Sequence, residues 1–491
     1  MLKQALLVFL LFSLCANSQN ENLDYDLVTE KFINHYNNQQ YDSIYYMFSS
    51  LMKKDVTKAG VRNYLRELRR FEGEIKDWKF EENRKPGEIE ISILPKIMLK
   101  IDRIDVATYN INFGKRNFKL DIAIDENKKI NEVSIRNPVD KTLAKNAINN
   151  ISAKESLLSK KQKEIIFDKL KYFPNKTEFS IALIKNGVVN YYGVKRHNDS
   201  VSYKDNRKGV FEIGSISKVF TSNLLANFVL GKKLELDDYI NDYIENPIKD
   251  SVLISFKSLA NHTSGLPRTP NNIEPTDPDN PYKSYGIENL EIYLRDSLKV
   301  NDEQKGNYLY SNLGVGLIGH TLTKIENDEI DKIYDNYIFK KYNMLNTSFS
   351  AEKSKEFLVI GIDSQGNEVP NWDLSSLAAA GGILSNSEDL VKYAIANFDS
   401  SNKDLNMIRN QTFKINRKTA IGLGWFIINP KSEKNKFYTH SGNTRGYSSM
   451  INIDLFRKNG IILLSNVSAF NRNVAKINQL GFKLMKTLKN N

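Results

Sequence analysis

Cysteine, histidine and long apolar runs are all scarce in this 491-residue chain, and each scarcity excludes a kind of chemistry. The single cysteine, Cys15, lies in the N-terminal segment, so disulfides and cysteine nucleophiles are excluded from the remainder. No two of the five histidines have the spacing of metal ligands, and the sequence predicts no metal site and no cofactor. Beyond the N-terminal segment, no apolar run is long enough to cross a membrane.

The charge is basic, with a formal net value of +12. Lysines and acidic residues are interleaved along the chain, and no basic arm or nucleic-acid recognition motif is present. We therefore expect a solvated basic surface and no nucleic-acid partner. The length favours two or three domains, and 41% hydrophobic residues suffice for a buried core.

Residues 1–18 have the pattern of a secretory signal peptide. Lys3 supplies the positive end, residues 5–14 are a short apolar core, and a small-residue cleavage site ends at Ser18. This predicts an exported protein, periplasmic or secreted. A lipoprotein anchored through Cys15 is the alternative, which the large Leu14 before the cysteine disfavours.

The first domain is predicted over residues 20–138 as a small α+β unit. Helical periodicity runs from Asp24 to about Arg70, and alternating patterns typical of strands follow up to Ile135. This order resembles that of NTF2-like domains, and we interpret the unit as accessory. Residues 139–160, polar and rich in lysine and asparagine, are predicted to be a linker to a second domain over residues 161–491.

The second domain mixes strands, helices and a long loop. Asn186-Gly187 between two apolar segments predicts a β-hairpin. A proline-rich stretch, Pro267 to Pro281, predicts a surface loop that borders a site. Helices are predicted at 313–327 and 330–342, strands near 437–440, 448–454 and 460–465, and a closing helix to about Leu488.

Ser215 and Lys218 form the candidate catalytic pair. Gly214 predicts a tight turn into an apolar helix, which places Ser215 at the helix start and Lys218 one turn further on the same face. A serine hydroxyl becomes a nucleophile when a neighbouring group takes its proton, and an amine can help if burial lowers its pKa. Ser-x-x-Lys alone is a weak signal, because it also occurs at Ser50, Ser350 and Ser400.

Four further stretches give the pair its context: residues 259–267, Tyr310-Ser311-Asn312, residues 379–385 and residues 440–448. Together with residues 211–221 they resemble the β-lactamase-related serine hydrolases, the group of class C β-lactamases, D-Ala-D-Ala carboxypeptidases, D-aminopeptidases and related esterases. The resemblance extends from about Leu170 to the C-terminus. It implies an α+β fold in which an antiparallel sheet is flanked by helices and an all-helical lobe is inserted between early and late strands.

The resemblance also implies roles for individual residues. Ser215 is the acylated nucleophile, Lys218 its proton partner, and Tyr310 a general base toward Ser215 and later an acid toward the leaving group. Asn312 binds the acyl side chain of the substrate, and the backbone N–H groups of Ser215 and Asn443 form the oxyanion hole.

Tyr310 serves as a base at neutral pH only if cations lower its pKa, and Lys218 and a protonated His440 are the available charges. His440 occupies the first position of the motif on the strand that lines the site. Without this context, Tyr310 would be read as a buried aromatic and His440 as a solvated strand residue.

Three residues bear on the substrate or on the turns around it. Class C β-lactamases resemble one another in having lysine where His440 stands, so the histidine favours the peptidase and esterase members. Arg445 stands where many relatives carry proline; a bidentate seat for a substrate carboxylate and an arginine pointing to solvent are equally open. His262 is expected to brace a turn by hydrogen bonding.

The sequence thus predicts an exported serine hydrolase that cleaves an amide or ester through an acyl-Ser215 intermediate. A D-amino-acid peptide, such as one derived from the cell wall, or a small ester is the expected substrate. A true β-lactamase is one alternative, and a degenerate protein that binds a ligand or β-lactam without turnover is another.

Overall fold

The computed structural model describes residues 23–489, apart from 54–55, 57, 85–104, 115–116, 137, 139–140, 152–157, 246, 275–276, 278 and 301–304. The chain divides into two compact units, Met1–Val139 and Asp140–Asn491. The predicted signal peptide and Cys15 lie outside the described residues, as do Pro275 and Pro278 of the predicted loop. Among the helices that are described, none has the length and apolar character needed to cross a membrane.

The first unit packs helices against one face of a four-stranded antiparallel sheet. A helix over residues 23–37 is followed by α2 (Tyr41–Met47), α3 (Ser50–Lys53) and α4 (Lys58–Glu72). The sheet has the order β1 (Asp77–Arg84), β2 (Val106–Asn112), β3 (Asn117–Ile124) and β4 (Ile130–Arg136). Buried aromatic residues from both layers, among them Phe32, Tyr36 and Tyr109, form its core, which confirms the predicted order of helices before strands.

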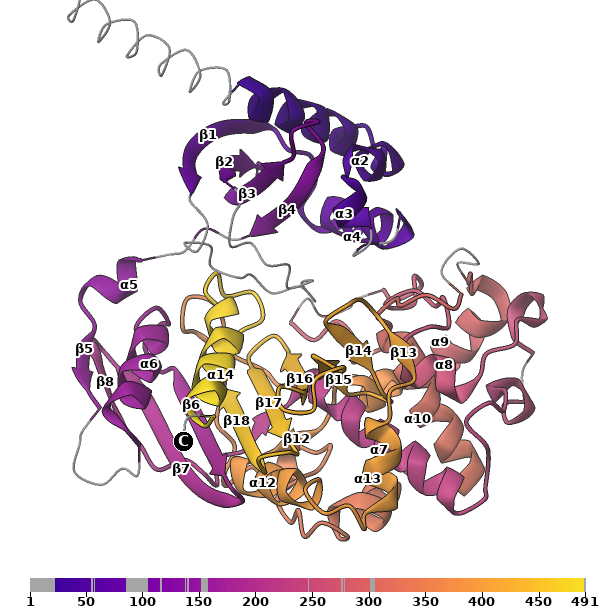
Figure 1. Cartoon of the computed structure of the whole chain (residues 1–491). Coiled ribbons are helices and arrows are strands. Elements are labelled where there is room, and N and C mark those ends of the chain that lie inside the picture. Colours follow the sequence, from indigo (N-terminus) through magenta and orange to yellow (C-terminus); the bar gives the residue numbers. More distant parts are fainter. Residues whose placement is uncertain are drawn as a thin grey trace, which may run out of the picture. The chain divides into compact units, whose positions relative to one another are not determined.

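The second unit is built on a ten-stranded sheet of order β13-β14-β15-β16-β17-β18-β6-β7-β8-β5 (Figure 1). Its early strands are β5 (Ile148–Asn150), β6 (Glu178–Lys185), β7 (Val188–His197) and β8 (Ser200–Tyr203). The late strands are β13 (Phe413–Lys414), β14 (Thr419–Ile421), β15 (Phe426–Ile428), β16 (Phe437–Asn443), β17 (Ser448–Asp454) and β18 (Asn459–Ser465). All pairs are antiparallel except β5 with β8, so the stretch predicted as a linker contributes an edge strand.

Both faces of the central strands are buried, which explains why these strands are apolar at consecutive positions rather than at alternate ones. Ile181 and Leu183 of β6 pack with α6 (Lys160–Leu170) and α14 (Ala475–Thr487) on one face. Their neighbours Ala182 and Ile184 belong to the core on the opposite face, to which α7 (Ser217–Leu230) also contributes. The hairpin between β6 and β7 turns at Asn186 (φ 52°) and Gly187 (φ 80°), as predicted.

The helical lobe lies between β9 (Phe211–Glu212) and β13 in the sequence. It holds α7, α8 (Phe256–Ala260), α9 (Ile287–Ile292), α10 (Asn312–Glu326), α11 (Ile330–Tyr334), α12 (Ser387–Ala396) and α13 (Lys403–Arg409). Two short sheets pair β9 with β12 (Leu384–Ser385) and β10 (Gly361–Ile362) with β11 (Glu368–Val369). The α+β fold with an inserted helical lobe is therefore confirmed.

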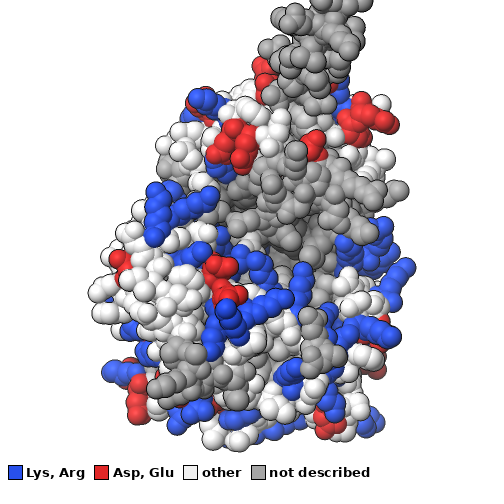
Figure 2. Space-filling model, turned by 60° about the vertical axis from the view of Figure 1, so that its left-hand side comes forward, with Lys and Arg blue, Asp and Glu red and all other residues white. Residues whose placement is uncertain are grey.

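Lysine and arginine side chains are scattered over the face drawn in Figure 2, with acidic side chains among them. On this face the mixture of charges is that of a solvated surface.

Candidate active site

Gly214 fixes the position of the nucleophile between two sheets. The preceding strand β9 pairs with β12, and the carbonyl of Ile213 accepts a hydrogen bond from Ser449 Oγ (2.8 Å) on β17. Gly214 has φ +50°, and a Cβ at this position would lie 2.7 Å from the backbone nitrogen of Asn443. Only glycine therefore permits the close approach of the nucleophile turn to β16. A short 3₁₀ turn, Gly214–Ile216, then leads Ser215 into α7.

Lys218 is fully buried in the first turn of α7. Its Nζ lies 3.0 Å from Ser215 Oγ and donates to the carbonyl of Ala380 at 2.6 Å. Burial, with a smaller contribution from the charge of Arg268, lowers the pKa of Lys218 well below its ordinary value. A lowered pKa favours the uncharged amine, whose lone pair can accept the hydroxyl proton of Ser215 while one of its N–H groups remains on Ala380.

One of the other Ser-x-x-Lys pairs, at Ser350, has the surroundings of an ordinary surface residue. Lys353, which follows Ser350, is exposed and forms an ion pair with Asp331 (3.3 Å). Burial therefore distinguishes Lys218 from this surface lysine, and the sequence pattern alone does not show it.

Tyr310 lies against the same serine, immediately before α10. Its ring centre is 5.0 Å from Lys218 Nζ and 5.1 Å from the guanidinium carbon of Arg268. Burial raises the pKa of Tyr310, while Arg268 and a hydrogen bond with Ser215 act to lower it. Arg268 is thus the cation that opposes the burial effect, a residue that the sequence reasoning missed.

His262 braces the turn that carries Tyr310, which confirms the expected structural role. It is fully buried with φ +60°, its Nδ1 accepts a hydrogen bond from the backbone N–H of Ser311 (3.3 Å), and its ring packs on Tyr310 with centres 4.4 Å apart. Burial lowers the pKa of His262 well below its usual value, so it is neutral.

His440 lies on β16 and is also neutral. Burial is the main cause that lowers its pKa to about 3. Its Nδ1 is 2.9 Å from the carbonyl of Ser441, which only accepts, so Nδ1 carries the proton. Nε2 is consequently an acceptor, and it is buried without a hydrogen-bond partner. A cationic histidine beside Tyr310, as the sequence suggested, does not agree with this environment.

A small hollow opens beside Ser215. Ser215, Asn312 and Asn443 line it together with the aromatic and apolar residues Tyr282, Trp372, Leu374 and Leu377. The Oδ1 atom of Asn312 is buried and accepts no hydrogen bond in the described part of the chain, whereas Asn443 Oδ1 accepts one from Ser448 Oγ (2.9 Å). The hollow therefore presents a free amide acceptor close to the nucleophile.

Arg445 forms an ion pair with Asp279 at the rim. Asp279 belongs to the stretch predicted as a loop bordering the site, and its carbonyl also accepts a hydrogen bond from Trp372 Nε1 (3.0 Å). Glu212 lies two residues before Gly214. It accepts hydrogen bonds from the backbone of Trp372 and the side chain of Asn371, both at 2.8 Å. Glu212 and Trp372 were not found from the sequence, because nothing in it relates residues so far apart.

The residues described here include no group of three or more histidine, cysteine or acidic side chains suited to a metal ion. The chemistry available from the side chains is that of a serine beside an amine of lowered pKa, a phenol and a neutral imidazole. That set is typical of a serine hydrolase that forms an acyl-enzyme.

Comparison with known proteins agrees with this class. A family model described as Beta-lactamase matches residues 177–485, more than half of the chain, and the chain belongs to this family of serine hydrolases. A second model, described as a protein of unknown function (DUF3887), matches residues 29–133, which is consistent with the NTF2-like resemblance of the first unit.

Individual relatives are distant. A β-lactamase of Providencia stuartii is 30% identical over 229 residues, which cover 45% of this chain and 55% of that protein, so the chain spans about half the length of this curated relative. The octameric penicillin-binding protein homologue of Pyrococcus abyssi has a TM-score of 0.55 at 22% identity, over 67% of this chain and 77% of the other. A β-lactamase/D-alanine carboxypeptidase of Pseudomonas syringae has a TM-score of 0.54 at 19% identity, over 66% and 97%. The two structures show likeness of fold.

Proposed function

We propose that this protein is an exported serine hydrolase that cleaves an amide or ester bond through an acyl-Ser215 intermediate. The observation that carries the proposal is the 3.0 Å separation between Ser215 Oγ and the Nζ of a completely buried lysine whose pKa is lowered well below its usual value. Burying a charged amine costs free energy, so burial favours the uncharged form of Lys218. The result is an uncharged base beside the hydroxyl of Ser215.

In the acylation step, Ser215 Oγ attacks the substrate carbonyl and its proton passes to Lys218 Nζ. The oxyanion that forms is held by the backbone N–H groups of Ser215 and Asn443, a contribution of about 3–4 kcal/mol per donor in other enzymes. Collapse breaks the bond to the leaving group, which takes the phenol proton of Tyr310. Lys218 then returns its proton to the phenolate. Water hydrolyses the acyl-enzyme by the same transfers in reverse.

This assignment gives Tyr310 the role of acid before that of base. Its pKa is raised in the free protein, so the phenol holds its proton at neutral pH, and Lys218 is the neutral base. Arg268 stabilises the phenolate that forms when the leaving group departs, since the guanidinium lies 5.1 Å from the ring centre.

A D-amino-acid peptide or a small ester is the proposed substrate. Neutral His440 presents Nε2 as an acceptor, which suits an N–H or O–H group of the substrate better than a carboxylate. A true β-lactamase is the second candidate, favoured by the 30% identical relative that carries this name.

The test uses a fluorescent fluorophosphonate, a chromogenic ester and the β-lactam nitrocefin. The wild-type protein is expected to be labelled and to turn over the ester, and Ser215→Ala to lose both, with a rate lower by a factor on the order of 10⁶. Ser350→Ala is the matched control, because it alters a Ser-x-x-Lys pair outside the site.

Each other outcome has a meaning. Nitrocefin turnover exceeding that of esters would favour the β-lactamase, and labelling without any turnover would favour a binding protein. Equal labelling of wild type and Ser215→Ala would refute the proposal. Export is tested separately by the N-terminal mass of the mature protein, which begins after residue 18 if the signal peptide is removed.

A further inference from the structure

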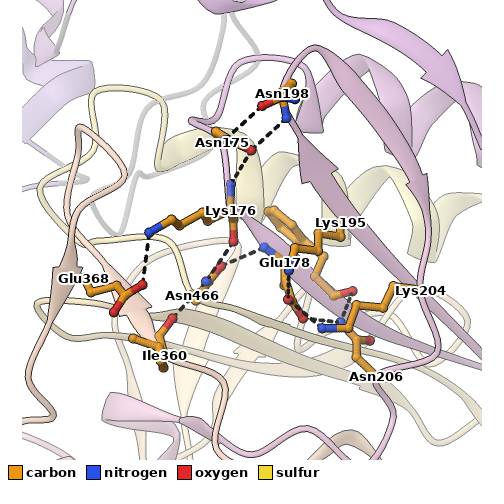
Figure 3. A network of polar contacts seen from close by, with 11 residues as sticks. Asn175, Lys176, Glu178, Lys195, Asn198, Lys204, Asn206, Ile360, Glu368 and Asn466 are labelled. Carbon is orange, nitrogen blue, oxygen red and sulfur yellow. Dashed lines mark hydrogen bonds and ion pairs between the residues drawn. The ribbon is translucent and has the colours of Figure 1, made fainter.

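A second hollow, of about 900 Å³, opens at the ends of β6 and β7 and shares no lining residue with the hollow beside Ser215. One side is formed by Glu178, Lys195 and Lys204, and the other by residues 356–360 and Ile362. Figure 3 shows Glu178, Lys195 and Lys204 on the first side and Ile360 on the second. Its volume is within the range of small-molecule sites. The mechanism proposed for Ser215 involves no residue of this second hollow.

The two sides are tied together by Asn466. Its side chain accepts a hydrogen bond from the backbone N–H of Glu178 (2.7 Å) and donates to the carbonyls of Lys176 (3.1 Å) and Ile360 (2.9 Å). Figure 3 shows this amide between the strand and the opposite wall. The shape of the hollow is therefore held by internal hydrogen bonds in the free protein.

The strand side carries more positive than negative charge. Lys204 Nζ and Lys195 Nζ lie 2.7 and 3.1 Å from the same oxygen, Oε1 of the buried Glu178. Lys176 at the rim has a carboxylate of its own, Glu368, at 3.0 Å. Two ammonium groups that share one carboxylate retain about one unit of positive charge. Both side chains are partly exposed, Lys195 by 37% and Lys204 by 42%.

The opposite wall begins with the exposed carboxylate of Glu356 and is apolar beyond it. Phe357, Leu358, Val359 and Ile360 are consecutive, and all line the hollow. Phe357 is 39% exposed and Ile360 53% exposed, while the two between them are half-buried. A run of four exposed or partly exposed apolar residues costs free energy in water and is retained mainly where it contacts something.

We propose that this hollow binds a small amphipathic anion. Its acid group, a carboxylate or a phosphate, bridges Lys195 and Lys204, and its apolar portion covers the Phe357–Ile360 wall. The charge selects an anion, and the apolar wall selects one with a hydrocarbon part over inorganic phosphate. The hollow is concave and about 900 Å³, which fits a small molecule and not a lipid bilayer.

The test measures binding of hexanoate, hexyl phosphate and uncharged 1-hexanol to the full chain by ligand-observed NMR. Hexanoate or hexyl phosphate is expected to bind at least about fivefold more tightly than hexanol, since only the acids interact with the surplus ammonium charge. The stronger of the two acids identifies the headgroup.

Four variants separate binding from structure. Lys195→Gln and Lys204→Gln each leave Glu178 one ammonium partner, so the fold is preserved while the surplus charge is lost, and binding is expected to weaken about tenfold. Lys176→Gln is the matched control, with a change below about threefold. Glu178→Gln releases both ammonium groups, and tighter binding of the acid is expected, which a purely structural role of the three residues would not produce.

Ile360→Ser tests the apolar wall, because its exposed side chain is removed without opening a core cavity; binding of the six-carbon acids is expected to weaken. The proposal is overturned if hexanol binds as well as the acids, if no probe binds, or if the Lys195 and Lys204 variants match Lys176→Gln. None of these results depends on catalysis by Ser215, so the outcome is independent of the proposed hydrolase activity.

Discussion

The guanidinium of Arg268 lies 5.1 Å from the ring centre of Tyr310, whose phenol group forms a hydrogen bond with Ser215. Its positive charge favours the phenolate and so lowers the pKa of Tyr310 against the effect of burial. Arg268 also supplies the carbonyl that accepts hydrogen bonds from the backbone of Asn312 (2.8 Å) and Leu313 (3.1 Å), which fixes the start of α10.

Arg268→Gln is expected to move the basic limb of the pH profile of kcat/KM to higher pH. The reason is that Tyr310 acts as an acid and loses activity when it ionises, and removing the cation raises its pKa. The rate at neutral pH should fall by about three- to tenfold, because the transient phenolate loses a favourable charge. A shift of the basic limb to lower pH would contradict this role.

Lys218→Met is expected to abolish ester turnover and to raise the melting temperature. Methionine fills a similar volume without an amine, and each unit by which burial lowers the pKa corresponds to about 1.4 kcal/mol. The carbonyl of Ala380 loses its donor, which offsets part of the gain. Calorimetry at pH 7 should show an increase of roughly 2–4 °C per kcal/mol gained. A large decrease in melting temperature would show that the lysine is charged and paired.

His440 should make the protein less stable in acid. Its pKa is about 3 in the folded state and about 6.5 when unfolded. Between these values the unfolded chain binds a proton that the native protein does not, so stability is lost as the pH falls from about 6.5 toward 3, by up to about 1.4 kcal/mol per pH unit.

Urea unfolding of His440→Gln between pH 7 and 4 should therefore show a shallower loss than wild type. His197→Gln, at a histidine on the surface, is the control. Equal slopes for wild type and His440→Gln would mean that His440 is protonated in the native state.

Gly214→Ala is expected to inactivate the protein and to destabilise it by about 1–3 kcal/mol. The new methyl group would lie 2.7 Å from the backbone nitrogen of Asn443, one of the two proposed oxyanion donors, and the residue has φ +50°. Gly187→Ala provides the comparison, since it also has positive φ (+80°) but no atom within 4 Å of its Cβ. If both variants keep full esterase activity, the oxyanion site lies elsewhere.

Arg445 is paired with Asp279 in the free protein, and two variants distinguish a carboxylate-binding role from a structural role. If it seats a carboxylate, Asp279→Asn should raise kcat/KM for a carboxylate-bearing ester about threefold relative to its methyl ester, and Arg445→Ala should lower it. Proportional changes for both esters in the two variants would assign Arg445 to the rim structure.

Local patterns predicted most of the fold. The alternation of apolar residues predicted β2 to β4, and the Asn186-Gly187 turn predicted the β6–β7 hairpin. Helical periodicity predicted α10, which begins one residue earlier than expected. The segment 330–342 was less regular than predicted, because α11 ends at Tyr334 and a wider π-helical turn, Asp335–Phe339, follows.

The candidate site was predictable only in part. Ser215, Lys218, Tyr310 and His440 stand in short motifs and were found from them. Arg268, Glu212 and Trp372 have no local signal, because what relates them to Ser215 is packing between segments distant in sequence.

The amino-acid sequence by itself determined the order of helices and strands, the glycine at the tight turn before Ser215, and the reactive groups that are present. These follow from local backbone preferences and side-chain type. Tertiary structure alone decided which of those groups carry charge. Burial removes water from Lys218 and His440 and lowers the pKa of each, while Arg268 stays exposed and provides the cation; desolvation is a property of the assembled fold and of no single segment.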